Sequence, residues 1–172
     1  MQGQAPDLAP FWAFARTLFP IAESIADLIY RKDNATGRNL TAVLANEFER
    51  VRPGYDGKAN VIALMYRHSL THTDEMRGLY CPRKTMTWKL SLDQPADHLK
   101  VRKAARGRRE LQFDLTAFYE DLHQVCLNVQ AGKWGKKVAQ RYNGWLLLNL
   151  DGKRPSHQDA INEIKKLFNR AT

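Results

Sequence analysis

The apolar residues of this chain change their spacing at Pro82. Before Pro82 they recur every three or four residues, which is the helical period. After it, residues 85–92 (TMTWKLSL) alternate apolar and polar side chains, and the segments 98–103 and 109–114 repeat the alternation around a turn that contains Gly107. Because alternation is typical of half-buried strands, the pattern predicts an α+β fold with a small antiparallel sheet of about three strands.

Helical periodicity covers most of the remaining sequence. We expect helices at about 11–30, 39–51, 57–77, 115–131 and 156–170. The chain has 172 residues, of which 44% are hydrophobic, and this is enough for one sizeable core. We therefore predict a single domain, residues 1–172, in which a mainly helical bundle carries the sheet as an insertion between helices.

Positive charge is in excess over the whole chain and is concentrated in one segment. The formal charge is +9, from 27 Lys and Arg against 18 Asp and Glu, so the protein attracts polyanions, of which RNA is the first candidate. Six cations fall within ten residues at the predicted hairpin: Lys100, Arg102, Lys103, Arg106, Arg108 and Arg109. Such a loop binds phosphates by charge, although cations also protect strand edges from pairing with other molecules. Six cations exceed the need of edge protection, which favours a nucleic-acid-binding role.

A second basic and aromatic group lies further along the chain. Its members are Lys133, Trp134, Lys136, Lys137, Arg141, Tyr142 and Trp145. Aromatic rings between cations can stack on bases, as in proteins that bind single strands. The neighbouring apolar residues favour packing of these rings in a core instead.

Neither cysteine usage nor the N-terminal sequence indicates secretion. Cys81 and Cys126 are far apart and lack the repeated spacing of a disulfide framework or a thiolate metal site. The first thirty residues lack a basic leader followed by a long apolar run. We expect a cytoplasmic protein with reduced thiols, no signal peptide and no membrane span.

Residues 66–77 (YRHSLTHTDEMR) contain two of the five histidines. On a helix, offsets of four and seven residues place His68, His72 and Glu75 on one face, where they could ligate a divalent metal ion. Alternatively, His72 continues the apolar stripe of the helix and is a partly buried histidine bonded to the backbone.

The same segment resembles the R-x(4–6)-H motif of the HEPN superfamily, with Arg67 and His72 as its two ends. The resemblance implies metal-independent cleavage of RNA, without a cofactor, by a homodimer in which both motifs line one cleft. Arg67 would bind the scissile phosphate and His72 would act as general acid or base, roles that suit guanidinium and imidazole. Many family members have Asn or another polar residue after the arginine, whereas this chain has His68, whose role stays open.

Three hypotheses follow from these patterns. The first is a HEPN-like RNA-binding protein or endoribonuclease, active in stress or defence, with Arg67, His72 and His68 at its centre. The second is a non-catalytic module that binds nucleic acid, or a protein partner not identified by the sequence, through the basic hairpin. The third is a metal-dependent enzyme that uses His68, His72 and Glu75.

Overall fold

The computed structural model describes residues 9–30, 36–66, 78–82, 84–132, 134–139 and 155–170. The chain forms two compact units, residues 1–138 and residues 139–172. In the second unit the described element is helix α7 (Pro155–Arg170), which confirms the helix predicted at 156–170. The described part of the first unit contains helices and one four-stranded sheet, so the predicted α+β class is confirmed.

Five helices of the first unit agree with the apolar stripes of the sequence. They are α1 (Ala9–Tyr30), α2 (Thr36–Val43), α3 (Glu49–Val51), α4 (Ala59–Tyr66) and α5 (Leu115–Ala131). A π-helical turn, Leu44–Phe48, joins α2 to α3 without a break, because the residues at both of its ends have helical backbone angles. This continuous stretch corresponds to the helix predicted at 39–51. Of the helix predicted at 57–77, α4 is the described part, and residues 67–77 lie outside the described residues.

The sheet contains the three predicted strands and one more. Its strands are β1 (Leu79–Cys81), β2 (Lys84–Ser91), β3 (Val101–Lys103) and β4 (Arg109–Asp114), in the order β1-β2-β4-β3. The short β1 was not predicted. It lies close to β2 because Gly78 precedes it: a Cβ atom at Gly78 would lie 2.9 Å from the carbonyl oxygen of Met86.

The sheet is mixed, whereas the sequence predicted antiparallel pairing throughout. Strand β4 is antiparallel to β3 but parallel to β2, with Met86 opposite Arg109 and Ser91 opposite Asp114. The reason is the loop 92–100, which carries the chain past the position of β4 before β3 begins. The predicted strand 98–103 starts later, at Val101, because Leu99 has a left-handed backbone (φ 64°) that a strand does not allow.

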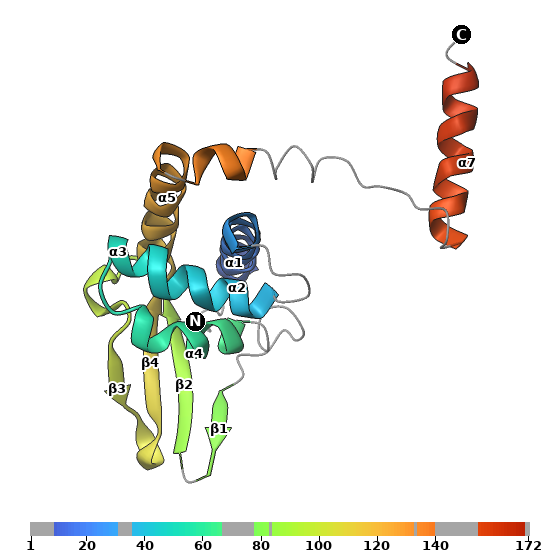
Figure 1. The fold of residues 1–172 in the computed structure, drawn as a ribbon. Coiled ribbons are helices and arrows are strands. Elements are labelled where there is room, and N and C mark those ends of the chain that lie inside the picture. Colours follow the sequence, from blue (N-terminus) through green and yellow to red (C-terminus); the bar gives the residue numbers. More distant parts are fainter. Residues whose placement is uncertain are drawn as a thin grey trace, which may run out of the picture. The chain divides into compact units, whose positions relative to one another are not determined.

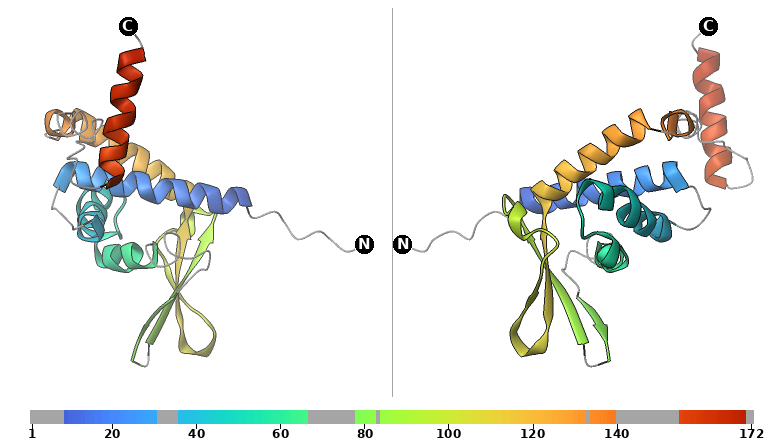
Figure 2. Two further views of the ribbon diagram at one scale, coloured as in Figure 1. Left: turned by 90° about the vertical axis from the view of Figure 1, so that its right-hand side faces the viewer. Right: turned by 60° about the vertical axis from the view of Figure 1, so that its left-hand side comes forward.

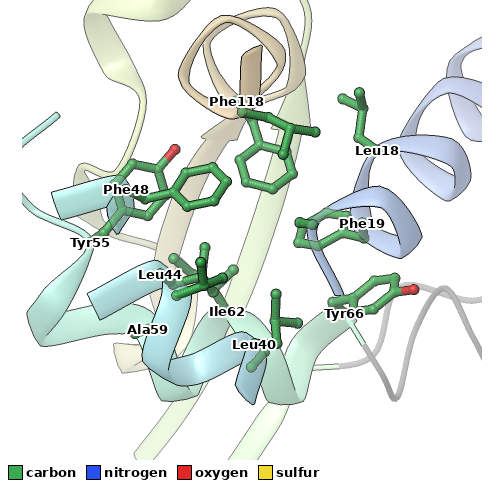
Figure 3. Close-up of a cluster of buried hydrophobic side chains, with 14 of the residues drawn as sticks. Leu18, Phe19, Leu40, Leu44, Phe48, Tyr55, Ala59, Ile62, Tyr66 and Phe118 are labelled. Carbon is green, nitrogen blue, oxygen red and sulfur yellow. The ribbon is translucent and has the colours of Figure 1, made fainter. Parts of the chain in front are cut away.

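One face of the sheet packs on the helices and forms the core. Trp88, Leu111 and Phe113 are buried on this face. The ring of Phe19 on α1 lies 5.5 Å from that of Phe113 and 4.4 Å from that of Tyr66. Figure 3 shows Phe19 and Tyr66 beside each other, and the ring of Phe118 on α5 lies 4.8 Å from that of Phe19. The aromatic cluster therefore joins α1, α4, α5 and the sheet into one unit.

The helices cover only part of the length of the sheet. Figures 1 and 2 show the strands projecting beyond the helices, with the β1–β2 and β3–β4 turns at the same projecting end. We call this the distal end; the opposite end, where β4 runs into α5, is the proximal end. Among the helices that the structure describes, none combines the length and the hydropathy that crossing a membrane requires.

Candidate nucleic-acid interface

Three strands bring basic residues together at the distal end of the sheet. Lys84 is the first residue of β2, Arg109 is the first of β4, and Lys103 is the last of β3. Lys103 is the direct cross-strand partner of Arg109, and Arg109 is the partner of Met86. Cross-strand partners lie on the same face of a sheet, and residues two apart on a strand share that face. Lys84, Lys103 and Arg109 therefore extend one face; with Arg108, they form the distal basic cluster.

The distal basic cluster has no acidic partners in the described part of the chain. Its four side chains are exposed, and none of them forms an ion pair with a described residue. Unpaired cations on a protruding surface produce a positive field that attracts phosphates.

Two of the six cations predicted to bind phosphates are paired within the protein. The ammonium of Lys100 lies 3.3 Å from one carboxylate oxygen of Asp97, and the guanidinium of Arg102 lies 2.6 Å from the other. Burial alone would raise the pKa of Asp97, but these two hydrogen bonds hold it below its ordinary value. Lys100 and Arg102 are thus partly neutralised. The side chain of Arg106, in the turn Ala105–Gly107, lies outside the described residues.

Edge protection explains only part of the basic surface. Strand β3 is an edge strand of three residues, so Arg102 and Lys103 do occupy positions where cations discourage pairing between molecules. Lys84 and Arg109 begin strands β2 and β4, which lie in the interior of the sheet and have neighbours on both sides. Their charges have no edge to protect.

An open hollow of about 580 Å³ lies beside these cations. Its lining is mostly apolar and includes Val61 of α4, Leu79 and Cys81 of β1, and Met86 of β2, with Lys84 and Arg109 as its basic members. Pockets that bind small ligands have volumes of roughly 300 to 1,000 Å³ and combine an apolar lining with a few polar groups. Neither the hollow nor the part played by Lys84 was predicted from the sequence. Residues 79–81 (LYC) are three consecutive hydrophobic residues without alternation, so no local pattern marks β1 as a strand.

The predicted catalytic residues lie outside the described residues. Arg67, His68 and His72, together with Glu75 of the metal hypothesis, all fall within residues 67–77, the segment of the chain between α4 and β1. Both hypotheses about this segment therefore stay predictions. In the described ranges, no group of three or more His, Cys, Asp or Glu side chains is arranged to hold a metal ion.

Other residues singled out in the sequence have structural positions. Trp134 is half-buried and packs against the core near Tyr30, at a ring distance of 6.2 Å, as the core-packing interpretation predicted. The ammonium of Lys137 lies 5.7 Å from the centre of the Trp134 ring. Both cysteines are free; Cys81 is exposed, and burial raises the pKa of the half-buried Cys126.

A hydrogen-bonded polar chain is buried near the proximal end of the sheet. The backbone N–H of Asp114 donates to Nδ1 of His98 at 2.9 Å, so a neutral His98 ring carries its proton on Nε2. Nε2 then donates to the hydroxyl of Tyr55 at 2.8 Å, and this hydroxyl donates to Asp121 at 2.9 Å. Arg52 donates to the same carboxylate oxygen at 2.7 Å. We call Arg52, Tyr55, His98 and Asp121 the buried polar chain.

The electrostatics of the buried polar chain favour a structural role. Burial, and secondarily the charge of Arg52, lowers the pKa of His98 to about 4, so the ring is neutral at physiological pH. Burial and the charge of Asp121 raise the pKa of Tyr55 well above its usual range. Tyr55 and the His98 side chain are fully buried. A substrate has no access to these two groups, and their hydrogen-bonding capacity is already used within the protein.

Comparisons of the whole chain with protein-family models, with curated proteins and with solved structures gave no match. The case for a function therefore rests on the geometry and charge of the distal end, and on the motif in residues 67–77.

Proposed function

We propose that this protein binds RNA through the distal basic cluster, Lys84, Lys103, Arg108 and Arg109. The observation that carries the proposal is that three strands converge on one protruding end with their cations exposed and unpaired among the described residues. Backbone phosphates are the groups that such a surface neutralises, and the release of counterions drives the binding. Strong dependence on salt concentration follows from this mechanism.

The double substitution Lys103→Ala/Arg109→Ala tests the proposal. These two residues are cross-strand partners, so the change removes two adjacent charges of the cluster. We expect the affinity for a single-stranded RNA oligonucleotide to fall about tenfold, and the slope of log K against log salt to become shallower by about 1.4, which is about 0.7 for each of the two lost phosphate contacts. Fluorescence anisotropy at several salt concentrations measures both quantities.

A matched control removes the same net charge elsewhere. Arg38→Ala/Arg50→Ala takes two exposed arginines from the helical stretch of α2 and α3. If binding depends only on the overall charge of +9, the control weakens binding as much as the distal variant does, and the proposal is wrong. If the control keeps wild-type affinity and the distal variant loses affinity, the result supports the distal basic cluster as the RNA-binding surface.

Cleavage of the bound RNA is the catalytic extension of this proposal. It relies on the resemblance of Arg67 and His72 to the HEPN motif, which implies a homodimer and a reaction without metal. Incubation of RNA with the protein in chelator, beside Arg67→Ala and His72→Ala, tests it. We expect the wild type to cut and both variants to bind without cutting. Intact RNA with the folded wild type would leave binding alone as the function.

A further inference from the structure

The hollow at the distal end lies directly beside the distal basic cluster. Leu79, Met86 and Val61 supply apolar surface, and Lys84 and Arg109 belong to the same lining. Leu79 is the cross-strand partner of Met86, and Met86 is the partner of Arg109. Apolar and cationic side chains therefore share one face of adjacent strands, within reach of a single ligand that has an apolar part and a negative charge.

We infer that this hollow holds one unstacked base of a single-stranded nucleic acid, while Lys84 and Arg109 bind the phosphates on either side of it. The inference rests on the proposed function and names the class of its ligand. In a duplex the bases are paired and stacked, so only a single strand can insert a base at no cost in base pairing.

The chemistry of the lining fits an aromatic ring with phosphates attached. The thioether of Met86 makes favourable contacts with aromatic rings, and Leu79 and Val61 offer apolar surface for the rest of the base. Lys84 and Arg109 supply the charge complementary to the backbone. A polyanion without bases uses only the cations, so occupation of the hollow distinguishes a single strand from other polyanions.

Substitution of Cys81 tests occupation without changing the charge. Cys81 lines the hollow and is exposed, so a larger side chain there fills the hollow without disturbing the core. Cys81→Trp is the variant that fills the hollow. Cys81→Ser, which keeps the side chain about as small as the native cysteine, is its control. Leu92→Trp introduces the same side chain at an exposed position after the end of β2, and serves as a second control.

Three probes of equal length are compared: a single-stranded oligonucleotide, its duplex, and an abasic strand that keeps the phosphates. We expect the wild type, Cys81→Ser and Leu92→Trp to bind the single strand about tenfold more tightly than the abasic strand. We expect Cys81→Trp to lose this preference and still bind the abasic strand as the wild type does.

The outcomes separate the two proposals. If the wild type binds all three probes equally, the inference that a base occupies the hollow is wrong, and the proposed function stays intact. If the wild type binds none of them, the proposed function is wrong.

Alkylation of Cys81 by a maleimide, followed by peptide mass mapping with Cys126 as internal reference, gives an independent readout. Protection of Cys81 by the single strand supports the inference. Protection by a fatty acid, and not by the single strand, would identify an acyl-chain site and overturn it.

Discussion

The polar groups at the two ends of strand β4 differ in burial and in hydrogen bonding. At the proximal end Asp114 is buried, and its carboxylate accepts hydrogen bonds from Ser91, from the backbone of Gln94 and from the backbone of Ala117 at the start of α5. At the distal end Arg109 is exposed and forms no ion pair within the described residues. This strand of six residues thus begins at a guanidinium with no ion partner among the described residues and ends at a carboxylate that accepts three hydrogen bonds.

This contrast distinguishes residues that hold the fold from residues available to a ligand. Burying a polar group costs free energy unless its hydrogen bonds are replaced within the protein, so the proximal groups are bonded to one another. Exposed cations keep their hydration and need no internal partner, so they stay free for an external anion. The comparison predicts that proximal substitutions change stability and distal substitutions change binding.

Loss of the Asp121 carboxylate is expected to have the largest effect on stability. Asp121→Ala leaves the guanidinium of Arg52 and the hydroxyl of Tyr55 without the acceptor that both use. Breaking a buried pair by removal of one partner costs roughly 3 to 5 kcal/mol, and Arg52 is about one third exposed, so we expect a loss of about 3 kcal/mol. Urea unfolding measures it. A loss below about 1 kcal/mol would mean that the buried polar chain does not hold the fold.

Acid should destabilise the protein through His98. Its pKa is near 4 in the folded state and about 6.5 in the unfolded chain, so between these values the unfolded state binds the extra proton. Stability therefore rises with pH across this window and falls on acidification. From pH 7 to pH 5 we expect the free energy of unfolding to decrease by about 2 kcal/mol from this residue alone.

The variant His98→Asn isolates this contribution. An asparagine oxygen can still accept from the backbone N–H of Asp114, but the side chain does not titrate. We expect the variant to be less stable at pH 7 and to show a flatter dependence of stability on pH between 5 and 7. If the slope of the wild type persists in the variant, another group causes it, and His98 is not the acid-sensitive member of the buried polar chain.

The local periods of the sequence predicted strands β2, β3 and β4, but neither β1 nor how the strands pair. Alternation located β2, β3 and β4 because side-chain direction in a strand has a period of two. The parallel pairing of β2 with β4 depends on the route of the loop 92–100. That route is fixed by distant contacts, such as the hydrogen bond from the backbone of Leu99 to that of Gln112. No local pattern encodes such a contact.

For the same reason, the sequence predicted only part of the candidate interface. The basic run of the hairpin is contiguous, so the sequence displayed it directly. Lys84 was not grouped with Arg109, because only the pairing of β2 with β4 brings them to one end. The buried polar chain has no sequence signature at all: Tyr55 is 43 residues from His98 and 66 from Asp121.

Substitutions in the distal basic cluster should have the smallest effect on stability. Arg108→Ala/Arg109→Ala removes two exposed side chains that have no ion pair in the described part of the chain, so the free energy of unfolding should change by no more than about 0.5 kcal/mol. Urea unfolding beside Asp121→Ala tests this. RNA affinity, measured on the same samples, should respond in the opposite order, with a decrease for the arginine variant and none for folded Asp121→Ala. A loss of 2 kcal/mol in the arginine variant would show that the distal cations help to hold the sheet, and the division between its two ends would fail.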